Sequence, residues 1–175
     1  MTPHDRDKLL TALRQSREAW LASLEGCTNA GQRPEENRWS VLEIAEHVSI
    51  VEKRLLGIIK NAPLGDPPLS VDEAREHTFG VELTNRNERF EAPEIVRPVG
   101  KMQTLEQAKE AFEAARAEIL EHVASGVNLR EKTAKHLKFG EVSAYEMTLI
   151  MSAHSARHAK QVAEVRAIVT APILV

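Results

Sequence analysis

The chain has 175 residues, of which 28% are charged and 4% are aromatic, and its formal net charge is −3. This length suits one domain around one hydrophobic core rather than two domains. The sequence has neither a basic excess nor a basic stripe, which argues against nucleic acid as a partner, because proteins that bind phosphate backbones normally carry one.

The sequence also predicts a cytoplasmic protein without a membrane span. Its apolar runs reach only four or five residues, whereas a spanning helix needs about 20. Residues 1–7 carry charge with no apolar stretch behind them, so we expect no secretory signal. The single cysteine, Cys27, cannot form an intrachain disulfide, which fits a reducing compartment.

Two amphipathic helices are predicted in the first third of the chain, at 3–25 and 40–60. Their apolar residues recur three and four positions apart, the spacing of a helix with one buried face. Pro3 suits the first helical position. Ser40 and Glu43 have the spacing of a capping box, in which the hydroxyl and the carboxylate each accept a free backbone N–H.

A long crossover, 61–103, is predicted to follow the second helix. It contains several prolines and is too long for a tight turn between antiparallel neighbours. Ser70, with Glu73 three residues later, marks the start of a short extra helix.

Two more helices are predicted at 104–125 and 143–170, the first of them with a capping box formed by Thr104 and Gln107. The fold class is therefore all-α: one domain over 1–175, a four-helix bundle with a long crossover between its second and third helices.

His154 and His158 lie four residues apart on the last helix, so their side chains project from one face within reach of a single metal ion. The row that contains them is otherwise mostly apolar and is predicted to face the core; it consists of Met147, Met151, His154, His158, Gln161, Val165 and Ile168. The opposite row is predicted to face solvent; it consists of Glu146, Ala153, Arg157, Lys160 and Glu164.

His47 lies near an apolar row of the second helix and is the candidate third ligand. Three neutral imidazoles with one open position are typical of a catalytic metal site. The other interpretation is that the histidines form separate hydrogen bonds, since an H-x-x-x-H pair arises by chance fairly often in a chain with seven histidines. Spacing alone leaves both interpretations open.

Three segments together resemble a known family: 38–48 (RWSVLEIAEHV), 136–141 (HLKFGE) and 152–161 (SAHSARHAKQ). A Trp-Ser helix start, one histidine, a long middle part and a final His-x-x-Arg-His occur in the order seen in the DinB/YfiT-like superfamily of metalloenzymes. The stretch 90–100 also resembles the middle connection of that family.

The resemblance implies a four-helix bundle that holds one divalent metal ion, typically nickel or zinc, through His47, His154 and His158. Members of known activity include thiol S-transferases, so the implied function is a metal-dependent transferase in which a metal-bound thiolate attacks a small molecule. A hydrolase with metal-bound water and a non-enzymatic, metal-stabilised binding or stress-response module are the alternatives. Lys160 stands where related sulfoxide synthases carry glutamate, so that activity is not supported.

The partners implied are a small-molecule substrate and a low-molecular-weight thiol, and a homodimer is compatible with the apolar segment 173–175. Catalytic residues are not assigned. Glu43 and Gln161 are candidates to orient the ligand histidines. For Glu43 the capping box is already a sufficient explanation, and for Gln161 a satisfied core amide explains the residue equally well. His136 either shapes a turn, which we favour, or lines the mouth of the site. Cys27 is interpreted as a small hydrophobic residue rather than a nucleophile.

Overall fold

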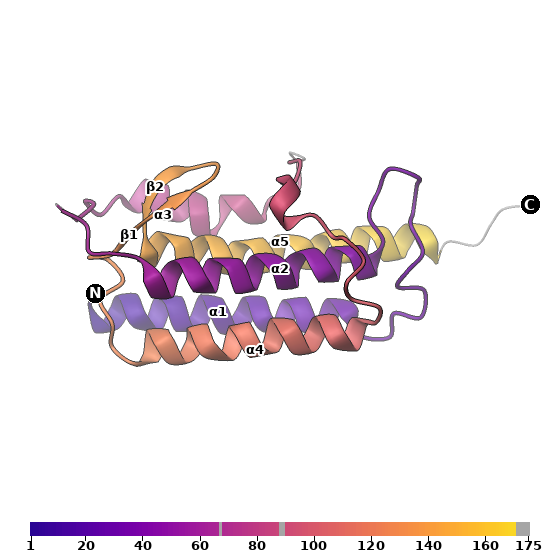
Figure 1. Ribbon diagram of the computed structural model, residues 1–175, viewed down its shortest axis with the longest axis horizontal. Helices are drawn as coiled ribbons and strands as arrows, with labels where there is room; N and C mark the ends of the chain where they lie inside the picture. The colour runs from indigo at the N-terminus through magenta and orange to yellow at the C-terminus, as the bar shows by residue number, and fades with distance from the viewer. Residues whose placement is uncertain (67, 88–89, 171–175) are drawn as a thin grey trace, which may run out of the picture.

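The computed structural model describes residues 1–66, 68–87 and 90–170, and four long helices lying side by side dominate it (Figure 1). Helix α1 contacts α4 and α5, and α2 contacts the same two helices. The four-helix bundle expected from the sequence is therefore confirmed. The long helices are α1 (Pro3–Leu24), α2 (Val41–Asn61), α4 (Leu105–Ala124) and α5 (Ala144–Val169).

The helices begin where the sequence predicts, because their caps form. Ser40 with Glu43, and Ser143 with Glu146, make complete capping boxes at the starts of α2 and α5. The box predicted at Thr104 and Gln107 is only half formed. The Thr104 side chain accepts the Gln107 N–H, but the Gln107 side chain accepts from the N–H of the residue before the cap.

The crossover between α2 and α4 packs on the bundle rather than standing away from it (Figure 1). Its helices are α3 (Glu73–Gly80) and the short 3₁₀ turns η1 (Glu82–Thr84) and η2 (Glu94–Val96). Helix α3 and η1 contact α5, whereas η2 contacts α2. The predicted start of the short helix at Ser70 is wrong, because Asp72 is the cap and accepts the Arg75 N–H.

A β-hairpin that the sequence did not predict precedes α5. Its strands, β1 (Thr133–His136) and β2 (Gly140–Ser143), pair antiparallel with Thr133 opposite Ser143 and His136 opposite Gly140. Gly140 has a φ of 71°, a conformation that other residues rarely adopt. Strand β2 ends on the cap of α5, so the hairpin is anchored at the start of the helix that carries two of the candidate ligands.

A fully buried guanidinium joins all four long helices at the centre of the bundle. Arg116 of α4 binds Glu52 of α2 (2.5 Å), the Leu13 carbonyl (2.6 Å) and Ser16 hydroxyl (2.7 Å) of α1, and the Ser155 hydroxyl of α5 (3.0 Å). Burial raises the pKa of the Glu52 carboxyl, and the facing guanidinium opposes that rise. The surrounding core is apolar, so each of these polar groups depends on the others.

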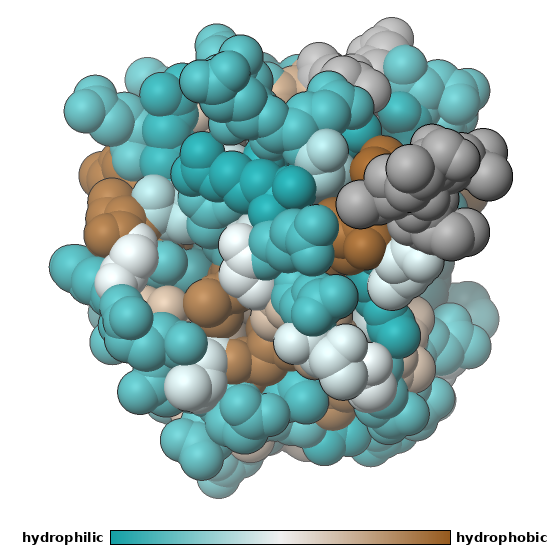
Figure 2. Space-filling view, turned by 90° about the vertical axis from the view of Figure 1, so that its right-hand side faces the viewer, coloured by the Kyte–Doolittle hydropathy of each residue, from teal (hydrophilic) through white to brown (hydrophobic). Residues whose placement is uncertain are grey.

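The end of the bundle that carries the loop between α1 and α2 is covered mostly by hydrophilic side chains, with small and separate hydrophobic patches (Figure 2). Among the described residues, no helix combines the length and the apolar composition that crossing a bilayer requires. The predicted contact segment 173–175 lies outside the described residues.

Replacing Arg116 by alanine should lower the free energy of unfolding by about 3–5 kcal/mol, because it leaves the Glu52 carboxylate buried without a counter-charge. Urea denaturation of the metal-free protein measures this loss. The double variant Arg116→Met/Glu52→Leu should recover most of it, since neither charge is then buried.

The control is Arg17→Ala, which removes a half-exposed ion pair with Glu113 and should cost about 1 kcal/mol or less. A loss at Arg116→Ala no larger than that of the control would show that the buried network does not stabilise the bundle.

Candidate metal centre

Three histidines from two helices converge on one point. His47 comes from α2, and His154 and His158 come from successive turns of α5. The Nε2 atom of His154 lies 3.2 Å from the Nε2 atoms of both His47 and His158. Nitrogens that bind one tetrahedral ion with bonds of roughly 2.0–2.1 Å are about 3.3–3.4 Å apart. The three side chains are thus close enough together to hold one metal ion.

Hydrogen bonds on the outer ring nitrogens orient two of these imidazoles. The Nδ1 atom of His47 lies 2.7 Å from the Val96 carbonyl oxygen, and that of His158 lies 2.7 Å from Gln161 Oε1. Because both oxygens accept, each Nδ1 carries the proton and each Nε2 keeps its lone pair. Arg86 donates to the same Gln161 oxygen (3.4 Å), which fixes the orientation of the amide.

The surroundings of the two ring nitrogens of His154 also favour a cation. Its Nε2 faces the lone pairs of the other two imidazoles, and its buried Nδ1 has no partner among the described residues. One proton on His154 Nε2 cannot form full hydrogen bonds to two acceptors at once. A cation at the centre satisfies all three Nε2 atoms together.

The electrostatic environment keeps the imidazoles neutral, which is the form that binds metal. Burial lowers the pKa of His154 and His158 well below the usual value, and the neighbouring imidazoles and the Arg157 charge lower both further. Burial also lowers the pKa of His47, although its bond to the Val96 carbonyl opposes the shift.

Glu43, a candidate to orient a ligand histidine, does not orient His47. The Glu43 carboxylate accepts the Ser40 N–H (2.8 Å) and binds the Arg33 guanidinium (2.9 Å), and the outer nitrogen of His47 is occupied by the Val96 carbonyl. The crossover brings a main-chain acceptor to this position from 49 residues away. Gln161, by contrast, is placed where the sequence suggested, on the outer nitrogen of His158.

Glu46 holds that acceptor in place, a role that sequence reasoning missed. Its carboxylate is buried (1% exposed) and accepts the backbone N–H groups of Val99, Gly100 and Lys101 at 3.0–3.1 Å. These residues begin three positions after Val96, where the turn η2 ends, so the carboxylate anchors the segment that presents the carbonyl to His47. A glutamate next to the candidate ligand and among apolar positions of α2 was the available signal.

The row of α5 predicted to face solvent is buried in part: Glu146, Ala153 and Arg157 are enclosed. Lys160 and Glu164, from the same row, are exposed as predicted. The burial arises because α3 and η1 cover this face. Arg157 donates to the Leu83 carbonyl (3.4 Å), and its Cζ lies 5.1 Å from the centre of the Phe90 ring. The prediction that Arg157 is a solvated arginine is therefore wrong.

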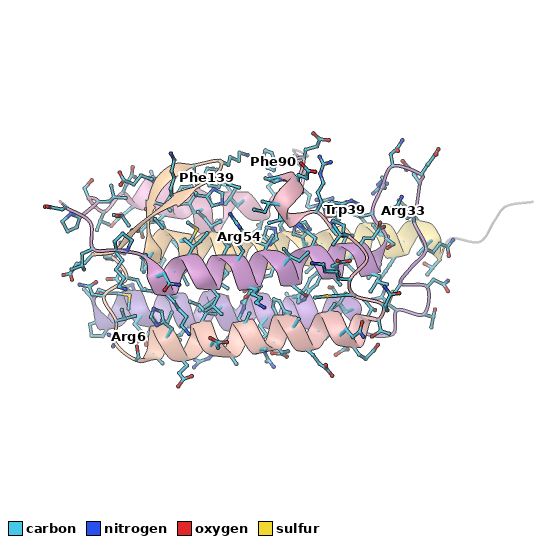
Figure 3. The ribbon with its side chains drawn as sticks, in the orientation of Figure 1. Arg6, Arg33, Trp39, Arg54, Phe90 and Phe139 are labelled. Carbon is cyan, nitrogen blue, oxygen red and sulfur yellow. The ribbon has the colours of Figure 1, made fainter. Side chains whose placement is uncertain are left out.

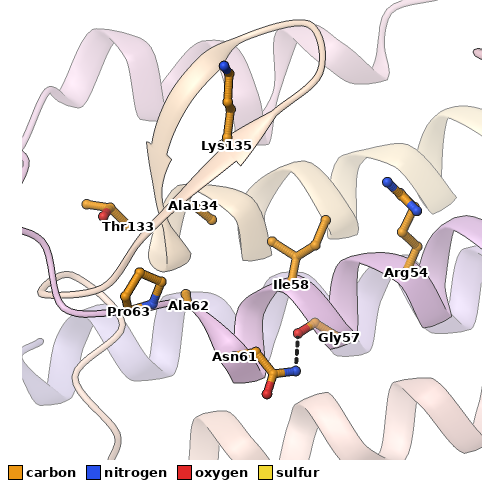
Figure 4. Close-up of a pocket in the computed structure, with 9 residues that line it drawn as sticks. All are labelled: Arg54, Gly57, Ile58, Asn61, Ala62, Pro63, Thr133, Ala134 and Lys135. Carbon is orange, nitrogen blue, oxygen red and sulfur yellow. Dashed lines mark hydrogen bonds between the residues drawn. The ribbon is translucent and has the colours of Figure 1, made fainter.

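A cavity of about 840 Å³ adjoins the three histidines, walled by the crossover and the hairpin. Figure 3 shows Trp39, Phe90 and Phe139 on the side of the bundle where these two segments lie. The Trp39 ring lies 5.0 Å from the His47 ring, so it lines the cavity as well as packing on the core. A second pocket, of about 570 Å³, lies between the end of α2 and β1, and it shares no lining residue with the first (Figure 4).

His136 shapes the hairpin turn, as favoured from the sequence, and also lines the cavity. Its Nδ1 accepts the N–H groups of Lys138 (3.1 Å) and Phe139 (3.3 Å), and its ring stacks on Phe139. Cys27 is half-buried and packs against an apolar cluster, in keeping with the prediction of a small hydrophobic role.

Comparison with known proteins places the chain in a family. The model of the DinB superfamily matches residues 12–162, which is most of the chain. The chain belongs to the DinB superfamily. No protein of curated function matches it.

Two solved structures resemble this DinB-superfamily protein in fold. One is TT2238, described as a four-helix bundle protein, at 24% identity and a TM-score of 0.60 over 91% of this chain and 98% of that one. The other is YfiT from Bacillus subtilis, described as a probable metal-dependent hydrolase with an unusual four-helix bundle topology. It shares 11% identity and a TM-score of 0.65 over 95% of this chain and 89% of that one.

Replacing Glu46 by glutamine should weaken metal binding roughly tenfold, the lower end of the effect expected for groups behind a ligand. The amide offers one acceptor oxygen where the carboxylate offers two for the three N–H groups, so the Val96 carbonyl is held less firmly against His47. Competition with a chromophoric chelator measures the affinity. Glu43→Gln, on the same helix, is the matched control and should leave it unchanged; equal effects of the two variants would contradict the role of Glu46.

The metal-free protein should lose unfolding free energy as the pH falls from about 7 to about 5. Unfolded imidazoles, with a pKa near 6.5, take up protons in this range, whereas the buried ones, with lowered pKa, do not. Denaturant titrations at several pH values measure the slope. A variant with all three candidate ligands changed to glutamine should show a shallower slope, and parallel slopes would contradict the buried neutral state.

Proposed function

We propose that His47, His154 and His158 bind one divalent cation, zinc or nickel, and that the protein is a metal-dependent enzyme acting on a small molecule in the adjoining cavity. The observation that carries the proposal is the convergence of three Nε2 atoms, two of them held as acceptors by bonds on their outer nitrogens. Imidazole is a suitable ligand for both metals.

The number of ligands supports catalysis over a purely structural role. Structural zinc sites are usually closed by four protein ligands, whereas catalytic sites keep a position open. Within the described part of the chain, the group that could hold the ion has three members, all histidine. A cavity of substrate size adjoins them. This is why the metal-stabilised binding module is the weaker alternative.

The reaction we favour is S-transfer from a low-molecular-weight thiol to an electrophilic small molecule. When bound, the cation lowers the pKa of a thiol or a water molecule at the open position. A thiol activated in this way needs no further base, whereas hydrolytic metal sites commonly add a carboxylate as general base. Glu91 is the one carboxylate among the described lining residues, and its side chain is 95% exposed.

Metal-dependent hydrolysis is the second candidate. It is favoured by the likeness in fold to YfiT, whose description names a probable metal-dependent hydrolase. Hydrolysis would use a general base near the metal, and His136 lines the cavity. Its Nδ1 accepts two backbone N–H groups, so its other ring nitrogen carries the proton and acts as a donor rather than as that base.

Each single His→Ala change at position 47, 154 or 158 should reduce bound metal to a small fraction of the wild-type content while leaving the helical bundle folded. Elemental analysis after dialysis against zinc or nickel measures the content, and circular dichroism checks the fold. The control is His77→Ala, because His77 is exposed on α3. Full metal content in His47→Ala would show that the site does not extend from α5 to α2.

The two reactions are distinguished on the cobalt-substituted protein. Under the S-transfer proposal, adding a small thiol should produce a sulfur-to-cobalt charge-transfer band, and the zinc or nickel protein should accelerate transfer of that thiol to a bimane electrophile. Loss of both signals in His158→Ala is expected. Absence of the band, together with metal-dependent cleavage of ester or amide substrates, would favour the hydrolase instead.

A further inference from the structure

Basic side chains are concentrated around the cavity beside the histidines, in a protein whose net charge is −3. Five basic side chains line it: Arg38, Arg86, Arg97, Arg157 and Lys138. Among the described lining residues they face a single carboxylate, that of Glu91. Low-dielectric walls concentrate such a field inside a cleft, which raises the local concentration of anions.

Several of these cations already have carboxylate partners. Arg86 binds Glu164 through two bonds (2.8 and 3.1 Å), and Arg38 binds Glu35 at 3.1 Å. Lys138 differs, because its ammonium contacts aromatic rings instead: it lies 3.1 Å from the centre of the Phe90 ring and 5.5 Å from that of Phe139. The ion pairs of the described residues do not include it. Arg97 lies 3.6 Å from Glu91, and Arg157 donates to the Leu83 carbonyl. The Lys138 ammonium, on an exposed residue of the hairpin turn, is thus the lining charge best placed to meet a ligand.

The position of Lys138 links the mouth of the cavity to the candidate metal centre. It lies in the exposed turn of the hairpin, and the Phe90 ring that it contacts also contacts Arg157, whose Cζ is 5.1 Å from the ring centre. Arg157 directly precedes His158 on α5, and both residues line the same cavity. Positive charge therefore continues from the surface to the imidazoles.

Apolar surface accompanies this charge. Trp39 and Phe90 line the cavity together with Leu83 and Ile150, and the Phe90 side chain is half-exposed. Exposed aromatic faces in a cavity wall offer contact area to an aromatic or aliphatic group. The candidate ligands add no negative charge, because all three are neutral imidazoles, so a bound divalent cation would keep its full charge at the base of the cavity.

We propose that the cavity selects a small molecule that combines an aromatic or aliphatic group with a carboxylate-like anionic group, and that Lys138 is the specificity-determining residue that binds the anion. The inference deepens the proposed function by naming its substrate class, and it relies on that function only for the nature of the reaction. The aromatic wall holds the apolar part, and the hairpin turn supplies the cation that discriminates against neutral analogues.

The test compares two probes of nearly the same shape, the anionic 2-naphthoate and the neutral 2-naphthamide, by titration calorimetry on the metal-free protein. Removing the metal excludes direct coordination of the carboxylate and separates this test from that of the proposed function. The naphthoate should bind roughly tenfold more tightly than the amide. Lys138→Gln should weaken naphthoate binding about fivefold, the effect of one exposed charge contact, and leave the amide unchanged.

The matched control is Lys135→Gln. Lys135 lies on the same hairpin but lines the other pocket (Figure 4), so its replacement should change neither affinity. Equal affinity for the two probes, no binding of either, or the same loss in both lysine variants would overturn the proposal. If the charge preference is present but the purified protein retains no metal, the substrate class stands and the proposed metal-dependent reaction fails.

Discussion

The Arg116 guanidinium at the centre of the bundle constrains how the four long helices stand relative to one another. Burying a charge without partners costs free energy of folding. Each helix that faces the guanidinium must therefore place a hydrogen-bond acceptor at the same level along the bundle axis. Glu52 on α2 and Ser155 on α5 are two of these acceptors. Ser155 follows His154 directly in sequence, and Glu52 lies on the same helix as His47. The alignment that satisfies the guanidinium is therefore also the alignment in which α2 and α5 bring their histidines together.

The crossover turns this aligned bundle into a site. It contributes the Val96 carbonyl that fixes the tautomer of His47, and Glu46 anchors the backbone that follows. It also covers the face of α5 that holds Arg157 and forms one wall of the cavity beside the histidines. The hairpin closes another side. The helices thus supply the ligands, and the two irregular segments supply their orientation and the walls.

The neutral imidazoles and the basic lining residues favour the same kind of ligand. Burial favours the neutral form of the imidazoles, so under the proposed function they would hold a cation without reducing its charge, and the basic lining residues would add to the positive field around it. Such a site favours ligands that arrive as anions or become anions when they bind. A thiol that loses its proton and a substrate with a carboxylate both meet that requirement, which connects the proposed reaction with the proposed substrate class.

The sequence by itself determined the four helices and the shared row of His154 and His158, because caps and helical periodicity act between residues three or four positions apart. It also indicated Gln161, one turn from its partner. It did not determine the carbonyl on His47 or the burial of Arg157. Both depend on where the crossover packs, and contacts across many residues leave no periodic signal. The hairpin was missed because its four-residue strands are too short to show a periodic pattern. Only tertiary packing placed Lys138, in the hairpin turn, over the cavity.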